Sequence, residues 1–190
     1  MKPKMLVPLL ILFISIASGC GLQPKKGEQQ STMNNITVRT AFVDGGAIPI
    51  KYANYGISGG QNVSLPLSWS SVQGAKSYAI IMYDTNPVAR NFVHWAVINI
   101  SPTVTGILEG ASGTSNMPDA CKELINNFSA KGYGGMQPPI GTGKHVYVVK
   151  VFALNTEMIS LQGEVNYNTF MSAIDGKVIG QGEISGWFGK

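Results

Sequence analysis

Residues 91–100 have the sequence NFVHWAVINI, and residues 143–154 have the sequence GKHVYVVKVFAL. Both are apolar runs rich in β-branched and aromatic residues, and each contains one of the chain's two histidines, His94 and His145. Runs of this length and composition predict buried β-strands. A histidine inside such a strand needs a hydrogen-bonding partner or a function, because a buried polar group without a partner is costly. These two strands therefore carry the first candidates for a functional site.

Similar short runs recur along the chain and are separated by turn-forming residues, with 23 glycines and 10 prolines in 190 residues. Strands of this kind, punctuated by glycine and proline, favour a mainly β fold, a sandwich or barrel, over alternating strands and helices. The further predicted strands are residues 36–43 (ITVRTAFV), 64–70 (SLPLSWS), 77–83 (SYAIIMY) and 177–188 (KVIGQGEISGWF).

Two segments have helical character. In residues 118–128, PDACKELINNF, the apolar residues Ala120, Leu124 and Phe128 recur every four positions, which places them on one face of a helix. Residues 166–176, NYNTFMSAIDG, offer Asn or Thr as a helix N-cap and end at a glycine that stops a helix. The sequence therefore predicts one or two short helices.

The first 19 residues have the pattern of a secretory signal peptide. Lys2 and Lys4 precede an apolar run from Met5 to Ile16, which is too short and wrongly flanked for a spanning helix. The segment ends in Ala-Ser-Gly followed by Cys20, which resembles the bacterial lipobox, in which the cysteine is acylated. Several acyl chains on one residue anchor a protein stably to a membrane.

This pattern predicts a signal peptide at 1–19, a lipidated Cys20 with a flexible polar tether through residue 35, and one domain at 36–190. The expected location is the bacterial cell envelope. In a Gram-negative cell, Gly21 after the lipidated cysteine indicates the periplasmic face of the outer membrane. Cys121 is then the only other cysteine and is expected to pack as a small apolar side chain.

Charge argues against a nucleic-acid partner. The formal net charge of +4 falls to +2 when Lys2 and Lys4 are removed with the signal peptide. The chain has no run of Lys or Arg interleaved with aromatic residues, which is the usual mark of a nucleic-acid surface.

Polar side chains near the strand ends suggest a pocket. His145 and Tyr147 lie on the same face of their strand, because side chains alternate along a strand. Asp84 ends the strand at 77–83, and the glycine- and proline-rich segment Gly134–Pro139 precedes His145. With His94, these residues are expected to converge on one pocket, although alternation alone does not show that they meet. Imidazole, phenol and backbone N–H groups are donors that suit a phosphate or a carboxylate.

Within this set the sequence leaves the part of Asp84 open. A carboxylate repels an anion in direct contact, so Asp84 either fixes the tautomer of a histidine or attracts an ammonium group on the same ligand.

Other chemical interpretations have weaker support. Asp84, His94 and His145 match a two-histidine, one-carboxylate metal set in composition, but no local metal-ligand spacing is present. Residues 56–60, GISGG, match the G-x-S-x-G pattern of a hydrolase, which requires a following helix, whereas a strand-like segment follows here. The glycine-rich loop also lacks the spacing of a nucleotide-binding P-loop. In the plainest interpretation, each histidine is a hydrogen-bonded structural residue.

Three segments resemble one known family. Residues 41–72, 82–100 and 132–154 contain, in order, AFVDGGAIPIKYANYGISGG, MYDTNPVARNFVHWAVINI and GYGGMQPPIGTGKHVYVVKVFAL. They are similar to the motifs of the phosphatidylethanolamine-binding protein family, in its bacterial Raf-kinase-inhibitor-like branch. The resemblance extends from about Ile36 to the C-terminus.

The resemblance implies a Greek-key β-sandwich of two antiparallel sheets with a small anion-binding pocket at one end. The positions that match the family's pocket are Asp84, His94, Gly135, Gln137, Pro138, Pro139, His145 and Tyr147. The chain departs from the family at Asn86, where the family has a second acidic residue, and at Val146, where it has Arg. Asn86 carries no charge, so attraction for an ammonium group is expected to be weaker.

The function expected from these observations is binding of a small anionic or phospholipid head-group ligand by a membrane-anchored protein, with no catalysis, cofactor or metal. His94, His145 and Tyr147 are expected to donate hydrogen bonds to the ligand. The alternative implied by the family is a protein–protein regulator of kinases or proteases that uses the same pocket. A hydrolase that uses the His and Asp residues is the least favoured reading.

Overall fold

The computed structural model describes residues 33–189. The predicted signal peptide and Cys20 lie outside these residues, as does the predicted tether up to residue 32. Strand β1 already includes Asn34 and Asn35, which the sequence analysis assigned to the tether.

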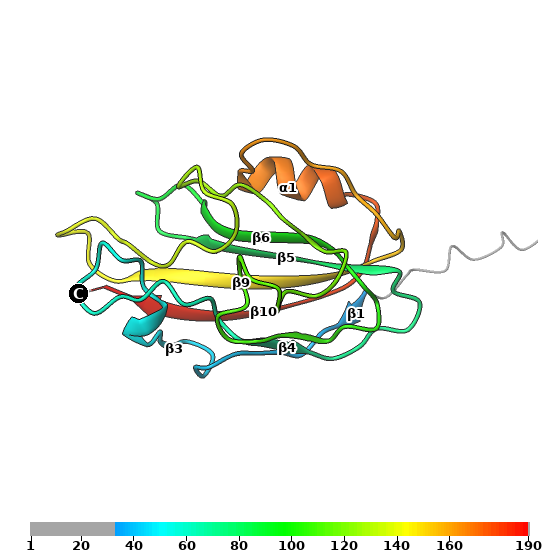
Figure 1. The fold of residues 1–190 in the computed structure, drawn as a ribbon, viewed down its shortest axis with the longest axis horizontal. Coiled ribbons are helices and arrows are strands. Elements are labelled where there is room, and N and C mark those ends of the chain that lie inside the picture. Colours follow the sequence, from blue (N-terminus) through cyan, green and yellow to red (C-terminus); the bar gives the residue numbers. More distant parts are fainter. Residues whose placement is uncertain (1–32, 190) are drawn as a thin grey trace, which may run out of the picture. The chain divides into compact units, whose positions relative to one another are not determined.

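The described residues form two β-sheets and one α-helix (Figure 1). The larger sheet has seven strands in the order β1-β10-β9-β5-β6-β8, with β3 also paired to β10, and the smaller sheet has the order β2-β4-β7. The elements are β1 Asn34–Asn35, β2 Val38–Arg39, β3 Gly46–Ala47, the 3-10 helix Ile50–Tyr52, β4 Leu67–Trp69, β5 Ser77–Asp84, β6 Phe92–Ile100, β7 Gly106–Ile107, β8 Lys122–Glu123, β9 His145–Leu154, α1 Tyr167–Ile174 and β10 Val178–Phe188.

This architecture confirms the predicted mainly β sandwich. The long central strands β5, β6, β9 and β10 coincide with predicted strands, and they pair antiparallel. Two short strands, β1 and β3, pair parallel to β10, because the chain leaves the β10 edge to form β2 and then returns to it. The predicted strand at 36–43 is reduced to two residues for the same reason.

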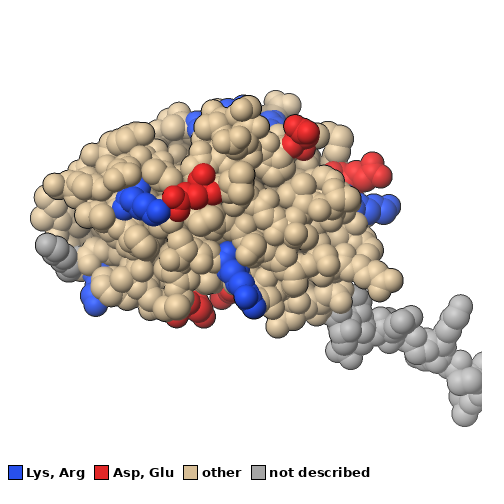
Figure 2. Space-filling model, turned by 60° about the horizontal axis from the view of Figure 1, so that its bottom comes forward, with Lys and Arg blue, Asp and Glu red and all other residues tan. Residues whose placement is uncertain are grey.

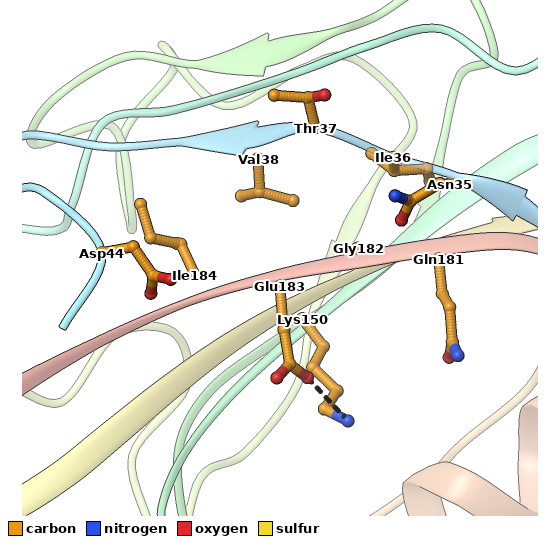
Figure 3. Close-up of a pocket in the computed structure, with 10 residues that line it drawn as sticks. All are labelled: Asn35, Ile36, Thr37, Val38, Asp44, Lys150, Gln181, Gly182, Glu183 and Ile184. Carbon is orange, nitrogen blue, oxygen red and sulfur yellow. Dashed lines mark ion pairs between the residues drawn. The ribbon is translucent and has the colours of Figure 1, made fainter.

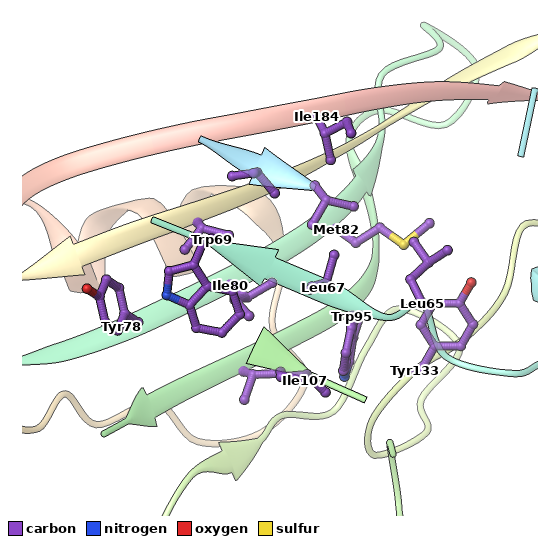
Figure 4. Close-up of a cluster of buried hydrophobic side chains, with 14 of the residues drawn as sticks. Leu65, Leu67, Trp69, Tyr78, Ile80, Met82, Trp95, Ile107, Tyr133 and Ile184 are labelled. Carbon is purple, nitrogen blue, oxygen red and sulfur yellow. The ribbon is translucent and has the colours of Figure 1, made fainter. Parts of the chain in front are cut away.

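The larger sheet is covered on both faces, which explains its continuous apolar runs. All eight residues of β5 are buried. Tyr78, Ile80 and Met82 face the smaller sheet, where they pack with Trp69 (Figure 4). The alternate residues of β5 contribute to a second apolar cluster with Phe170 of helix α1, which lies across the other face of the sheet (Figure 1). In a strand that is buried on both faces, polar and apolar residues do not alternate.

Helix α1 confirms the prediction for residues 166–176. Asn166 is its N-cap: the side-chain oxygen accepts a hydrogen bond from the Thr169 amide at 2.9 Å, and the Thr169 hydroxyl accepts from the Asn166 amide. This reciprocal arrangement satisfies amides that the first turn leaves without partners.

The helix predicted at 118–128 is wrong. Lys122 and Glu123 form β8, which pairs antiparallel with β6, and Ala120 has a left-handed backbone with φ of 61°. The Trp95 indole donates to the buried Glu123 carboxylate at 2.8 Å, and this bond holds the segment extended against the sheet. The four-residue spacing of apolar residues was a coincidence that tertiary contacts override. Cys121 packs partly buried against the main core, as predicted.

Charged side chains are sparse on the surface. On the face shown in Figure 2, Lys, Arg, Asp and Glu lie in a few separate groups of both signs, surrounded by uncharged surface. No helix of the described residues is long and apolar enough to cross a membrane.

Candidate functional site

Three central strands bring four polar side chains to one end of the larger sheet. Asp84 is the last residue of β5 and lies opposite Tyr147 of β9, so both side chains point to the same face. The ring of Tyr147 lies 5.2 Å from the ring of His94 on β6 and 6.4 Å from that of His145, measured between centroids. The structure therefore gathers Asp84, His94, His145 and Tyr147 in one cluster.

His145 is held by the protein at both ring nitrogens. Its Nδ1 lies 2.6 Å from Asp84 Oδ2, and its Nε2 lies 2.8 Å from the hydroxyl of Thr142. The side chain is fully buried. In this arrangement His145 has no nitrogen left to donate to a ligand, so the predicted donor role does not follow from its geometry.

The hydrogen bonds of Thr142 show where the hydrogens of the His145–Asp84 pair lie. The Thr142 hydroxyl donates to the carbonyl oxygen of Pro139 at 2.6 Å, so it accepts its second bond from Nε2–H of His145. A further proton then lies between Nδ1 and the carboxyl group of Asp84. The pair carries one negative and one positive charge, or none, and in either form it adds no net charge that would repel an anion.

Asp84 is fixed at its other oxygen as well. Asp84 Oδ1 accepts a hydrogen bond of 2.8 Å from the backbone amide of Asn86. The side-chain oxygen of Asn86 in turn accepts from the amide of Val88 at 3.0 Å. Asn86 therefore shapes the turn after β5, and its side-chain oxygen already accepts a hydrogen bond within that turn.

His94 is a neutral histidine with one nitrogen free. Its Nδ1 lies 2.7 Å from the carbonyl oxygen of Gly134, so Nδ1 carries the hydrogen. Burial lowers the pKa of His94 to about 4, against the smaller raising effect of the Gly134 hydrogen bond. The rings of Phe92 and Phe128, 5.1 and 5.4 Å from the imidazole, contribute to this apolar surrounding. At neutral pH, Nε2 of His94 is thus a hydrogen-bond acceptor.

The hydroxyl of Tyr147 has no hydrogen-bond partner among residues 33–189, although it is buried. Burial raises the pKa of Tyr147 above its usual value. The Asp84 carboxylate adds to this effect through its charge and through a side-chain contact with the hydroxyl that lies outside hydrogen-bond geometry. The phenol therefore keeps its proton. A buried hydroxyl without a partner is uncommon, because an unmade hydrogen bond costs the full desolvation of the group. It marks the position where a ligand atom or a water molecule would accept a bond.

The segment Gly134–Pro139 supports the cluster without offering its first amides to a ligand. The Gly134 amide donates to the carbonyl of His94 at 2.8 Å, and the Gly135 amide donates to Asn62 Oδ1 at 2.6 Å. Gly135 packs so closely on the backbone of residues 52–54 that a Cβ atom would collide with it. The backbone N–H groups of these two glycines, which the sequence suggested as donors to a ligand, are therefore already bonded within the protein.

The other predicted residues of this segment point elsewhere. Gln137 is exposed and its side-chain amide lies against Gly56. Pro138 and Pro139 line an apolar cavity on the side of the loop that faces the end of β10.

Three contributors were missed by the sequence analysis. Thr142 bonds His145, Asn62 bonds Gly135, and Asn126 donates to the carbonyls of Gly132 and His94 at 2.9 and 3.4 Å. Thr142 stands between two glycines three residues before His145, and this short loop could have suggested a return contact. Asn62 lies 73 residues from Gly135 and Asn126 lies 32 residues from His94, and no local pattern points to either contact.

Another cavity, of about 420 Å³, lies along the free part of the β10 edge (Figure 3). It opens between residues 35–38 and Glu183, where the chain departs to the smaller sheet. Glu183 forms a partly exposed ion pair with Lys150, 2.9 Å between Oε2 and Nζ. The cavity is explained by strand topology. Within residues 33–189, no group of three or more His, Cys, Asp or Glu side chains is arranged to hold a metal ion.

The fold and the cluster define a β-sandwich protein with a buried polar site at one end of its larger sheet. Residues 38–189 match the family described as phosphatidylethanolamine-binding protein, and the chain belongs to that family. The match covers all four residues of the cluster.

Relatives with solved structures share the fold. The chain is 28% identical to E. coli YbcL, whose crystal structure superposes with a TM-score of 0.75 over 82% of this chain and 98% of that one. The homologue CT736 of Chlamydia trachomatis is 30% identical, with a TM-score of 0.68 over 83% and 99% of the two chains. Each of these solved chains therefore corresponds to this chain over nearly its whole length.

Two curated relatives extend the comparison. The chain is 34% identical over 149 residues to the UPF0098 protein of Methanothermobacter thermautotrophicus, covering 78% of this chain and 94% of the relative. It is also 34% identical over 113 residues to a Mycobacterium tuberculosis protein named putative lipoprotein LppC, covering 60% and 52% of the two chains.

Proposed function

We propose that the domain binds a small phosphate-bearing ligand at the cluster of Asp84, His94, His145 and Tyr147, as a binding module without catalysis. The observation that carries this proposal is the buried Tyr147 hydroxyl with no partner among residues 33–189. In the proposal this hydroxyl donates to a phosphate oxygen. The family's description as phosphatidylethanolamine-binding supports a phosphate-bearing head group.

The neutral state of His94 favours a ligand that carries a hydrogen-bond donor in addition to its phosphate oxygens. His94 is neutral and accepts at Nε2, because its pKa is about 4 and its Nδ1–H is bound to Gly134. A phosphate monoester carrying one proton, or an ammonium group on the same ligand, supplies the matching donor. Asp84 and His145 hold the wall of the site and together add no net charge to it.

Calorimetric titration of residues 21–190 with phosphorylethanolamine and with methyl phosphate tests the proposal. Tyr147→Phe removes one hydrogen bond to a charged oxygen and is expected to weaken binding about 10-fold or more. Tyr78→Phe is the matched control: Tyr78 is a buried tyrosine at the opposite end of β5, where its hydroxyl bonds the amide of Val72.

Tyr78→Phe is expected to leave binding unchanged. Equal affinities of the wild type and Tyr147→Phe for both ligands, or no binding to either, would refute the proposed site.

The same proposal places the domain on a membrane through Cys20. The support is the Ala-Ser-Gly-Cys sequence at residues 17–20 and the lipoprotein name of the Mycobacterium tuberculosis relative. Acylation at Cys20 would tether the binding site within reach of the bilayer of the cell envelope. A membrane-attached module of this kind has phospholipid head groups in its immediate surroundings.

A further inference from the structure

An apolar cavity of about 510 Å³ lies at the end of the larger sheet where β10 ends, and we refer to it as the apolar groove. None of its lining residues carries a charge. The lining consists of Ile48, Ile50, Ile57, Ser58, Pro138, Pro139, Ile140, Gly141, Gly143, Trp187, Phe188 and Gly189. The proposed phosphate site uses none of these side chains, so the groove needs an explanation of its own.

One residue of the lining projects from the surface. Ile140 is fully exposed, although it borders the groove, and Ile50 in the same lining is 51% exposed. The loop before β9 extends beyond the sheet at the end where the label C lies (Figure 1). A single exposed apolar side chain is ordinary on a protein surface, whereas a contiguous apolar patch marks an interaction site. Here the exposed isoleucines and the hollow form one such patch.

The projection and the hollow make the patch complementary to itself. A two-fold contact between identical chains brings the same patch of both copies together, so each copy must present both a projecting and a receiving part. Ile140 supplies the first and the apolar groove the second. The groove has the volume of a small-molecule site, which is more than one isoleucine side chain needs.

The chain that precedes the domain does not suit the groove. Residues 21–32, GLQPKKGEQQST, contain one large apolar side chain, Leu22. Strand β1 joins the sheet beside Gly180, near the start of β10, whereas the groove lies at Trp187–Gly189 at its other end. Neither the composition of this segment nor its point of entry matches the groove.

The backbone of the lining argues against an extended peptide. Pro138 and Pro139 have no N–H group, and the amide of Ile48 is already bonded to the carbonyl of Trp187 at 2.9 Å. A peptide laid in the groove would find few partners for its own polar groups. An apolar side chain that projects from a folded surface needs no such partners.

The cations near the groove are engaged within their own copy. The ammonium group of Lys144 lies over the ring of Trp187, 3.7 Å from its centroid. Lys51, next to Ile50 in the chain, pairs with Glu109 at 2.9 Å. The centre of the patch is thus free of charge, as in the core of protein interfaces.

We propose that the apolar groove is a contact between two copies of this chain, in which Ile140 of each copy is seated in the groove of the other. Ile140 lies two residues before Thr142, which bonds His145, so the contact steadies the loop beside the cluster. The inference goes beyond the proposed function and does not depend on it.

The size of the lining sets the expected strength of the contact. Twelve residues line the groove, about half of the 20–30 that each partner contributes to a stable interface. The dimer is therefore expected to be weak, with a dissociation constant on the order of 100 µM.

Sedimentation velocity of residues 21–190 without ligand, from about 10 µM to about 1 mM, brackets this value and tests the inference. The wild type is expected to change from monomer to dimer as its concentration rises. Ile140→Asp puts a charge into the apolar groove of the other copy and is expected to weaken association about 10-fold or more. Because Ile140 is fully exposed, this variant is expected to keep the fold.

The matched control is Met158→Asp, which places the same charge at an apolar side chain that is 72% exposed and lies outside the lining. This control is expected to associate as the wild type does. In a mixture of ¹³C-labelled and unlabelled protein, isotope-filtered NMR is expected to show contacts between the Ile140 methyl groups of one copy and the Trp187 ring of the other.

A monomer at all concentrations, or equal association of Ile140→Asp and the wild type, overturns the inference. A monomer whose Trp187 signals shift when a peptide ending in phenylalanine is added also overturns it and assigns the groove to a peptide. Since these measurements contain no phosphate ligand, their failure leaves the proposed function standing.

Discussion

Tyr147 and Tyr78 are both buried tyrosines, but their hydroxyl groups have opposite surroundings. The Tyr147 hydroxyl has no partner among residues 33–189, whereas the Tyr78 hydroxyl accepts the Val72 amide at 2.9 Å. Tyr147→Phe is therefore expected to change the free energy of unfolding by less than about 0.5 kcal/mol or to raise it, since no bond is lost. Tyr78→Phe leaves a buried amide without a partner and is expected to cost about 1–3 kcal/mol.

Urea denaturation of the two variants measures this contrast. A loss of more than about 1 kcal/mol in Tyr147→Phe would show that its hydroxyl is bonded in the free protein, contrary to the geometry on which the proposed function rests.

His94 makes stability depend on pH in the mildly acidic range. Its pKa is about 4 in the folded protein and about 6.5 in an unfolded chain, so only the unfolded chain binds a proton between these values. The contribution of neutral His94 to the free energy of unfolding is fully present above pH 6.5. It is lost as the pH falls toward 4, and the loss reaches up to about 3 kcal/mol.

Denaturant midpoints measured from pH 7 to pH 4 check this dependence against His94→Asn, whose amide can still donate to Gly134. The variant is expected to lose the part of the slope that His94 causes. The same slope in both proteins would mean that His94 is not held neutral.

The sequence identified the four residues of the cluster but not the bonds between them. Strand alternation places His145 and Tyr147 on one face, the positions of Asp84 and His94 in their strands add these two residues, and the family motifs support the same set. Whether a histidine donates or accepts depends on which loop atoms reach its nitrogens. The two atoms are the Thr142 hydroxyl oxygen and the Gly134 carbonyl oxygen. Both belong to an irregular loop, whose backbone follows no sequence periodicity.

At the scale of elements, two of the four glycines in the segment from Gly134 to Gly143 have different roles. A Cβ on Gly135 would strike the backbone of Tyr52 and Ala53, whereas Gly141 has open space around it and needs glycine only for its φ of +84°. Gly135→Ala is expected to destabilise the domain by about 2–3 kcal/mol and Gly141→Ala by about 1 kcal/mol.

Urea denaturation of the two variants gives the comparison, and the His94 ring signals report whether the Gly134 contact is kept. If Gly135→Ala costs no more than Gly141→Ala, the close approach of this loop to residues 52–54 is not required for the fold.

Long elements could be predicted from the sequence, while short ones could not. β5, β6, β9 and β10 each contain eight to eleven residues, so their composition alone indicates strands. Among the two-residue strands, β1, β3 and β8 form against the edge of a long strand, whereas β2 and β7 pair with the three-residue β4. The helix prediction for residues 118–128 was wrong because a distant contact decides their conformation. Their extended form is stabilised by the Trp95–Glu123 hydrogen bond, which joins residues 28 positions apart.

At the scale of the whole molecule, the proposed lipid anchor at Cys20 and the described domain lie in separate parts of the chain. The domain from Met33 onward contains both apolar clusters, so loss of the anchor is not expected to affect its fold. In a bacterial host, Cys20→Ala is expected to move the protein from the membrane fraction to the soluble fraction. A protein that stays in the membrane fraction after this change, with its N-terminus processed as before, would contradict acylation at Cys20.

Because the proposed anchor and the domain lie in separate parts of the chain, ligand binding can be measured without the anchor. The match covers 98% of the solved YbcL chain, so residues 21–190 are expected to suffice for the binding experiments. Attachment to the membrane would then raise the local concentration of head groups without changing the site itself.

The most direct test of the central claim follows both histidines by ¹⁵N NMR while phosphorylethanolamine is added to residues 21–190. The chain has only two histidines, and they differ in what they can offer: His94 has a free Nε2, whereas both nitrogens of His145 are bonded within the protein. The account predicts a saturable shift of His94 Nε2 toward a hydrogen-bonded value, with a smaller change at His145. Unchanged signals from both histidines at millimolar ligand, or a shift confined to His145, would contradict it.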